Sequence, residues 1–378
     1  MDEHDGQPPR FGVEEEYFLL DAADGTVVPS GSRVLRRARR LLGELVSGEF
    51  TEYQIEAKTP PCTTLPELDA HLARARAVTA AAAATESCRI LASGTPIRAP
   101  SLPAPIPDNP RNRSSIAIHR ALSEDHIVCA THVHVETPSR QDAVLISNHL
   151  RPWLPALIAL AANSPFWNGR DTGYASWRTI ITNRLPVAGP PPYFTSLAHY
   201  ETLSETLRSS GTTVDQGTLF WDVRPCAHLP TVEIRAMDVV TDHHEAAALA
   251  ALIRALVTTA LAKVHRDEAA PRPSEALLRA AYWRAARDGS CGHLLDPCSG
   301  RLLPADRMLG QLLEYARRAL TASGDLPTVE RVLQRLATCC GAERQRRAYA
   351  THQSLRSVTE HLADATTRTN DIAHAQGH

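Results

Sequence analysis

Four short segments of this 378-residue chain alternate polar and apolar side chains with the period of a β-strand, and this pattern most constrains the fold. Successive side chains of a strand point to opposite faces of its sheet. In each segment one face carries acidic, amide or imidazole groups, while the other face is mostly apolar. The segments are Gly12–Leu20, Phe50–Ala57, Cys129–Glu136 and Thr231–Arg235. A sheet face that gathers glutamate and histidine from separate strands indicates a site for cations.

The polar faces of these strands predict a cluster of carboxylates. Residues two apart on a strand are separated by about 6.6 Å, so Glu14 and Glu16 can converge on one ion or bracket two. Two bare carboxylates about 4 Å apart repel by about 4 kcal/mol at an effective dielectric near 20, so the cluster would take up protons or bind cations. Oxygen ligands suit Mg²⁺ or Mn²⁺. The alternative is that each glutamate is exposed or paired with an arginine. The predicted polar face holds Glu14, Glu16, Glu52, Gln54, Glu56, His132, His134, Glu233 and Arg235.

Composition excludes several classes of protein. The net charge of −2 gives no electrostatic case for nucleic acid or an anionic membrane as a partner. No uninterrupted apolar run reaches the roughly 20 residues of a membrane span. The eight cysteines form no C-x-x-C pair, and the acidic start is not a signal peptide, which favours the cytoplasm. Arginine dominates the basic residues, with Lys58 and Lys263 the only lysines, so a phosphate clamp here must use arginine.

The order of the predicted elements favours an α+β fold with an antiparallel sheet, because strands and helices interleave without βαβ regularity. We predict a disordered lead over residues 1–10, a single domain over 11–365 that is helical from about Ser274, and a polar tail over 366–378. A further strand is expected at Val214–Val223. Helical patterns cover Ser32–Leu45, Leu65–Ala92, Gln141–Ala162, His199–Arg208 and Asp242–Val264.

Two further groups of residues could carry chemistry. His132-x-His134 has the spacing of a metal-binding pair, as in zinc hydrolases, and His243–His244 could add imidazoles. The Gly- and Trp-rich segment 162–178, with Asn163, Tyr174 and Arg178, suits recognition of a carboxylate or phosphate, and so does Arg224. No P-loop, Rossmann or nucleophile-elbow motif occurs.

The motifs taken together resemble the carboxylate–amine ligases of the glutamate–cysteine ligase type 2 family. Each motif is modest alone, but their number and order, from about residue 11 to about 300, carry the resemblance. The motifs are GVEEE, the Q-I-E-x-x-T-P run at Gln54–Pro60, THVHV, ANSPFW, DTGY, SWR, GPPPYF, WDVRP and PTVEIR.

The resemblance implies a glutamine-synthetase-like fold, in which an antiparallel sheet backed and flanked by helices cups the active site. It implies ATP-dependent amide-bond formation through an acyl phosphate, with Mg²⁺ or Mn²⁺, between small-molecule carboxylate and amine substrates; a γ-glutamyl bond is one option. The residues that match the family's motifs would act as follows. The metal ligands would be Glu14, Glu16, Glu56, His132 and Glu233; Arg235, Glu233 and Arg178 would be catalytic; Arg224, Arg235 and Arg178 would bind the nucleotide; and Asn163, Tyr174 and His134 would position substrate.

The sequence departs from the family pattern at three places. Ala130 replaces a glycine, the segment Thr182–Val187 lacks an expected Trp-Pro-Thr, and Lys58 replaces an apolar residue. The last two changes adjoin the predicted site and leave the substrates open. Two other functions remain as alternatives: a non-catalytic nucleotide- or amino-acid-binding homologue, and a zinc-dependent hydrolase using His132 and His134. The oligomeric state is also open, with a homo-oligomer one option.

Overall fold

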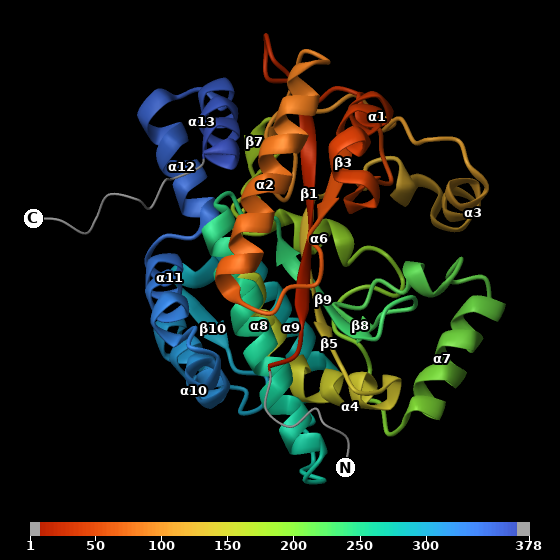
Figure 1. Ribbon diagram of the computed structural model, residues 1–378, viewed down its shortest axis with the longest axis vertical. Coiled ribbons are helices and arrows are strands. Elements are labelled where there is room, and N and C mark those ends of the chain that lie inside the picture. Colours follow the sequence, from red (N-terminus) through yellow and green to blue (C-terminus); the bar gives the residue numbers. More distant parts are fainter. Residues whose placement is uncertain (1–7, 369–378) are drawn as a thin grey trace, which may run out of the picture.

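The computed structural model describes residues 8–368, and its centre is one antiparallel sheet of seven strands (Figure 1). The strand order is β2-β3-β1-β5-β9-β8, and β4 pairs with the far end of β1. The sheet therefore brings together segments that lie far apart in the sequence. Its strands are β1 (Phe11–Asp21), β2 (Val46–Gly48), β3 (Gln54–Lys58), β4 (Cys88–Leu91), β5 (Ala130–Glu136), β8 (Val223–Pro225) and β9 (Thr231–Asp238).

Helices surround the sheet on several sides. In Figure 1 the C-terminal helices α10–α13 lie on the left, while α3 and α7 lie on the right. The helices are α1 (Gly31–Leu42), α2 (Leu65–Ala84), α3 (Pro110–His119), α4 (Arg140–Leu150), α5 (Leu154–Ala161), α6 (Trp177–Thr182), α7 (Leu197–Ser209), α8 (His243–Val264), α9 (Glu275–Asp288), α10 (Ala305–Ser323), α11 (Leu326–Thr338), α12 (Gly341–His352) and α13 (Leu355–Thr367).

The apolar face of the central strands packs against helices. Val13, Val133 and Ile234 are fully buried in one cluster with residues of α5 and α8, as the strand alternation predicts. Within residues 8–368, α8 alone is long and apolar enough to cross a membrane, but 67% of its most apolar window is buried inside the protein. We therefore describe α8 as the core helix behind the sheet.

One acidic residue of β1 belongs to the helix-covered face. Glu15 lies between Glu14 and Glu16 in sequence and so points to the opposite side, where it is completely buried. The Arg76 guanidinium of α2 donates to Glu15 at 3.0 Å and to the Val240 carbonyl at 2.9 Å. This ion pair joins α2 to β1 and to the segment between β9 and α8.

The structure confirms the predicted α+β class, with an antiparallel sheet, and corrects several elements. The strand expected at Val214–Val223 is wrong: Asp215 and Thr218 form a capping box around a short 3₁₀ turn, and β8 begins only at Val223. The helix expected to reach Ala92 ends at Ala84, and β4 follows it. The helix expected over Gln141–Ala162 is divided into α4 and α5 around Pro152 and Pro155, because proline lacks the N–H that a continuous helix needs.

The C-terminal part is mainly helical from Glu275, as expected, but it also holds the hairpin β10 (His293–Leu295) and β11 (Leu302–Pro304). The predicted lead and tail fall largely outside the described residues. Where they are described, Arg10 of the lead forms a 2.8 Å ion pair with Glu136, and α13 extends into the predicted tail as far as Thr367.

Candidate active site

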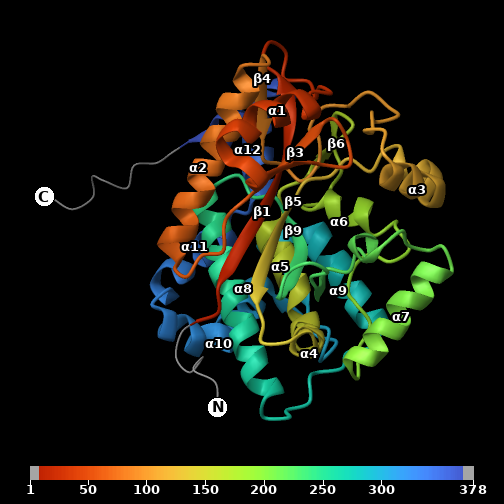
Figure 2. The same cartoon turned by 45° about the vertical axis from the view of Figure 1, so that its right-hand side comes forward.

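The polar face of the sheet forms the floor of a cavity of about 410 Å³. Strands β1, β3, β5, β8 and β9 supply the floor, and α3 with the segments around Phe50, Thr182 and Phe220 supplies the walls. Figure 2 shows α3 and α7 on the side of the sheet away from α10 and α11. The predicted residues that line the cavity are Glu14, Glu16, Glu56, His132, His134, Arg178, Arg224, Glu233 and Arg235.

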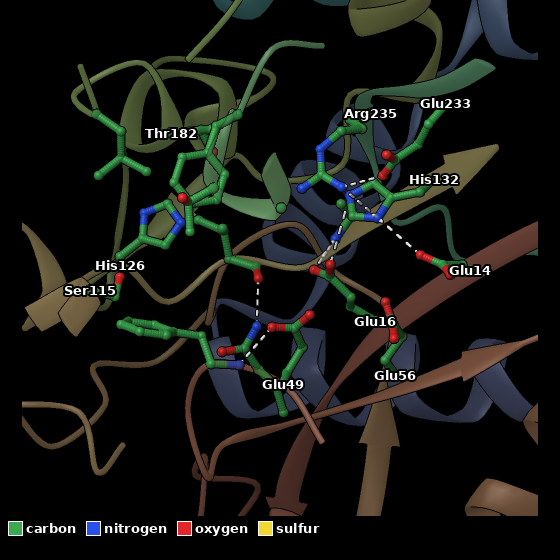
Figure 3. Close-up of a pocket in the computed structure, with 18 of the residues that line it drawn as sticks. Glu14, Glu16, Glu49, Glu56, Ser115, His126, His132, Thr182, Glu233 and Arg235 are labelled. Atoms are coloured by element: carbon green, nitrogen blue, oxygen red, sulfur yellow. Dashed lines mark hydrogen bonds and ion pairs between the residues drawn. The ribbon is translucent and has the colours of Figure 1, made fainter. Parts of the chain in front are cut away.

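Four carboxylates converge on one side of this cavity (Figure 3). Antiparallel pairing of β1 with β3 sets Glu16 directly opposite Glu56. Glu49, in the turn between β2 and β3, adds a further carboxylate, and one oxygen of each of these three lies within 4.8 Å of the others. Glu14 lies next to them on β1. Sequence reasoning missed Glu49 because it precedes the strand, and it misplaced Glu52, which instead accepts hydrogen bonds from Ser32 at the start of α1.

Burial of these carboxylates disfavours their charged form, so the cluster tends to bind protons or cations. Burial, together with the charges of Glu14 and Glu49, raises the pKa of Glu56 to about 7. Burial and the charges of Glu49 and Glu56 raise the pKa of Glu16 well above its ordinary value, and burial also raises the pKa of Glu49. For Glu14, burial acts upward, but hydrogen bonds to His132 and His134 hold its pKa below the usual range. A divalent cation would relieve this repulsion, which is what the sequence argument anticipated.

The donor set fits a hard cation such as Mg²⁺ or Mn²⁺ better than zinc. Carboxylate oxygens dominate it, as Mg²⁺ and Mn²⁺ prefer. A zinc site of the hydrolase type would need His132 and His134 in one group of ligand atoms. Within residues 8–368 they lie in two different groups, Glu14–Glu56–His132 and Glu14–His134–Glu233. His243 and His244 lie outside the cavity, and both bond Asp69, at 2.8 and 2.9 Å.

Glu233 and Arg235 project from β9 onto the same face, beside His132. Arg235 is bonded to Glu233 through Nη1, lies 3.4 Å from His132 Nδ1, and its side chain is 18% exposed. Burial acts to raise the pKa of Glu233, but the Arg235 and Arg224 charges hold it well below its ordinary value. Burial and the nearby Arg235 charge lower the pKa of His132 to about 3, so this imidazole is neutral at physiological pH.

Arg224 has a different position from the one expected of a phosphate ligand. Its Nε donates to Glu233 at 2.9 Å, and its Nη1 donates to the carbonyls of Gln216, Gly217 and Leu219. The guanidinium is thus committed to neighbouring protein groups. It fixes Glu233 and the wall formed by residues 216–219, although it also lines the cavity.

Arg178 enters the cavity from the start of α6, held by a buried aspartate. Its Nη2 donates to the Arg235 carbonyl at 2.9 Å, and its Nη1 lies 3.9 Å from Asp238. Asp238 accepts hydrogen bonds from Ser164 at 2.6 Å and from Ser176, the residue that caps α6, at 2.7 Å. Arg178 Nε is buried and has no partner among the described residues, and the side chain lines the cavity.

Asn163 and Tyr174 do not line the cavity, which corrects the expectation that they position substrate. Asn163 is 1% exposed and donates to the carbonyls of Ala92 and Val239, so it ties chain segments together behind the site. The Tyr174 hydroxyl instead accepts a hydrogen bond from Trp283 at 3.1 Å. Their motif was correctly placed near the site, but only Arg178 in it reaches the cavity.

The wall opposite the carboxylates is aromatic and was not anticipated. His126 lies 6.5 Å from the Phe50 ring and 6.4 Å from the Phe220 ring, centroid to centroid. The His119 ring lies 6.2 Å from the Phe220 ring, centroid to centroid. Figure 3 shows His126 and Ser115 across the cavity from the glutamates. These residues come from α3 and from loops without periodicity, so no pattern in the sequence marked them.

Comparison with known proteins agrees with this geometry. A family model described as glutamate-cysteine ligase family 2 matches residues 10–361. The chain belongs to this family. It is 41% identical over 355 residues to a Saccharopolyspora erythraea protein named "Putative glutamate–cysteine ligase 2-1", covering 93% of each chain. It is also 41% identical over 359 residues to a Salinispora arenicola protein named "Putative glutamate–cysteine ligase 2", covering 94% of each.

Solved structures share the fold. A glutamate–cysteine ligase from Francisella tularensis, in complex with AMP, superposes with a TM-score of 0.70 at 11% identity, covering 97% of this chain and 91% of that one. A bifunctional glutathione synthetase from Pasteurella multocida gives a TM-score of 0.71 at 16% identity, covering 95% of this chain and 52% of that one. The glutamine-synthetase-like fold predicted from the motifs is confirmed.

The family places the chain among ATP-dependent ligases that form amide bonds. The zinc-hydrolase and non-catalytic alternatives are not favoured. The coarse function predicted from the sequence is therefore confirmed.

Proposed function

We propose that this protein joins the carboxylate of a small acid to an amine, activating the acid as an acyl phosphate with ATP and with Mg²⁺ or Mn²⁺ held by the glutamates. The observation that carries this proposal is the convergence of Glu14, Glu16, Glu49 and Glu56 on one side of a cavity that also receives Arg235 and Arg178. Anionic and cationic groups in one cavity suit a nucleotide triphosphate together with its metal ions.

The chemistry begins with a poor acyl donor. In the first step a carboxylate oxygen of the acid attacks the γ-phosphorus of ATP and ADP leaves. In the second step the amine nitrogen attacks the acyl carbon, phosphate leaves, and the nitrogen loses a proton. Divalent ions, when bound, neutralise charge on the β- and γ-phosphates. The protein's own task is to position the reactants in line and to stabilise the developing charge.

Arg235 is the residue we assign to the transferring phosphoryl group. Its side chain lines the cavity and is partly exposed, and its guanidinium forms an ion pair with Glu233. An arginine aimed at this group stabilises negative charge that grows in the transition state. We assign Arg178 to the phosphates or to the acid substrate, because its buried Nε still has a proton to donate. We assign Arg224 to holding Glu233 in place.

Among the acids, glutamate linked through its γ-carboxylate is the first candidate, since the relatives named above carry glutamate–cysteine ligase in their names. We place the reaction in the cytoplasm, where ATP is available. All eight cysteines are free, which is consistent with a reducing compartment.

The test is a screen for ADP release with ATP, Mg²⁺ and a matrix of amino acids and amines, with products identified by mass. We expect ADP release that requires both an acid and an amine, and a product whose mass is that of the two minus water. Nucleotide binding without ADP formation across the matrix would favour a binding protein instead. Amide hydrolysis without ATP would favour the hydrolase.

A further inference from the structure

Lys58 is a cavity-lining residue whose ammonium lies among the proposed metal ligands. Its Nζ is 3.0 Å from Glu14 Oε1 and 2.8 Å from Glu56 Oε2. Its side chain lines the cavity and is 32% exposed. The chain has only one other lysine, Lys263.

The strand pairing fixes this position. Lys58 is directly opposite Glu14 in the β1–β3 register and two residues after Glu56 on β3. Cross-strand partners and residues two apart share one face of a sheet. The Lys58 side chain therefore leaves the sheet on the same face as the glutamates, and only a change of register, which would also move Glu56, would put it on the other face.

The ammonium occupies the space between two ligands that a divalent ion would otherwise bridge. Glu14 and Glu56 form, with His132, one of the ligand groups of the cavity. Magnesium binds carboxylate oxygens at about 2.0–2.1 Å, so an ion bridging Glu14 Oε1 and Glu56 Oε2, the two oxygens that Nζ contacts, would overlap the ammonium. Two cations there would also repel each other. Two further ligand groups remain, Glu16–Glu49–Glu56 and Glu14–His134–Glu233, and each of them shares only one glutamate with Lys58.

We propose that Lys58 is a tethered cation that takes the Glu14–Glu56–His132 position, so that this protein binds one divalent ion fewer than the same cavity with an apolar residue at position 58. This inference rests on the proposed function, in which the glutamates hold divalent ions. It makes Lys58 a positioning residue, which keeps Glu14 and Glu56 in place by a bond that is not lost when free metal is scarce.

The test counts Mn²⁺ ions bound to the full-length, nucleotide-free protein, by titration followed with electron paramagnetic resonance. Lys58→Met should bind one more Mn²⁺ per chain than the wild type. Lys58→Arg, which keeps the positive charge, should bind the wild-type number. Lys263→Met is the matched control, because Lys263 is also ion-paired, at 2.8 Å to Glu268, and is similarly exposed, at 30%; it should bind the wild-type number as well.

Equal stoichiometry in Lys58→Met and the wild type would overturn the inference while leaving the proposed function intact. Absence of Mn²⁺ binding in both would overturn the inference and the metal part of the proposed function together. ADP release then reports on the ligase assignment separately.

A second measurement uses the wild-type protein and needs no variant to fold. An amine-acetylating reagent should modify Lys263 and Lys58 at rates that peptide mass spectrometry resolves. We expect the rate at Lys58 to be unaffected by saturating Mn²⁺, because its ammonium stays between Glu14 and Glu56. Acceleration of Lys58 acetylation by Mn²⁺, with Lys263 unchanged, would show that a metal ion displaces the ammonium and would contradict the inference.

Discussion

At the scale of single residues, the site depends on ion pairs in which one charged side chain holds the other in position. Glu233 is nearly buried and is bonded from two sides, by Arg224 and by Arg235. Three backbone carbonyls hold the Arg224 guanidinium in place. Arg224 in turn holds Glu233, and Glu233 holds Arg235. Loss of one member should therefore affect the chemistry more than its direct contact with substrate suggests.

Arg235→Ala should lower the rate of amine-dependent ADP release by about 10³-fold or more, as loss of an arginine that stabilises a transferring phosphoryl group does. Glu233→Gln should also abolish turnover, since it removes a proposed metal ligand and the anchor of Arg235. Arg208→Ala is the control, because Arg208 is exposed on α7 and forms an ion pair with Glu205, outside the cavity. Circular dichroism should show all three variants folded; near-normal turnover of Arg235→Ala would remove its assignment.

At the scale of secondary-structure elements, buried polar residues hold the pieces that carry the site. Asp238 at the end of β9 binds Ser164 and the cap of α6, and so determines where Arg178 enters the cavity. Gly94 approaches this carboxylate so closely that an added Cβ would lie 2.7 Å from Asp238 Cγ. None of these contacts follows from a strand or helix period, because they join segments far apart in the sequence.

Asp238→Asn should reduce ADP release by displacing Arg178 and should destabilise the fold by about 1–3 kcal/mol, the range for a disrupted buried hydrogen-bonding group. Asp364→Asn is a suitable comparison, since Asp364 forms one exposed ion pair with Arg89. Steady-state ADP release and urea unfolding measure the two effects. Full activity in Asp238→Asn would show that Arg178 is positioned by other contacts.

The Arg76–Glu15 pair gives a second prediction at this scale. Arg76→Met should destabilise the protein by about 3–5 kcal/mol, because it leaves the Glu15 carboxylate buried without its partner. The double variant Arg76→Met, Glu15→Gln should recover part of that loss, and chemical denaturation of the single and double variants measures the coupling. A loss below about 1 kcal/mol, the value typical of exposed pairs, would contradict the role of this pair as a clamp between α2 and the sheet.

At the scale of the whole molecule, the aromatic wall links stability to pH. Burial, with the positive charges of Arg184 and Arg178, lowers the pKa of His126 to about 4, below the ordinary value of 6.5. Between these values the unfolded chain binds a proton that the folded protein does not, so His126 reduces stability as pH falls from about 6.5 towards 4. The effect fades as pH rises above 6.5, because the unfolded chain then loses the same proton.

His126→Gln should therefore lose less stability than the wild type between pH 7 and pH 5. Thermal unfolding of both proteins at the two pH values gives the comparison, and the difference between the two losses isolates His126 from other titrating groups. An identical loss in both proteins would mean that His126 titrates normally in the folded state.

The sequence by itself determined the strand faces and the chemistry they carry. Alternation along single strands is a local property, and it placed Glu14, Glu16, Glu56, His132, His134, Glu233 and Arg235 on what proved to be the floor of one cavity. Helices with a clear period, such as α8, were also predicted within a few residues. The order of the family motifs along the chain then predicted the glutamine-synthetase-like fold, which composition alone does not predict.

Only the tertiary structure decided which residues meet and which merely lie near a motif. Glu49, His126 and Phe220 come from turns and loops, where no period predicts a direction, and they reach the cavity because the sheet closes around them. Asn163 and Tyr174 belong to a motif beside the site but point elsewhere, because their amide and hydroxyl groups bond other segments. The physical reason for the division is that side-chain alternation along one strand is local, and it fixes which face a residue occupies. Register is the pairing between distant strands, and it decides what stands opposite, as with Lys58 and Glu14.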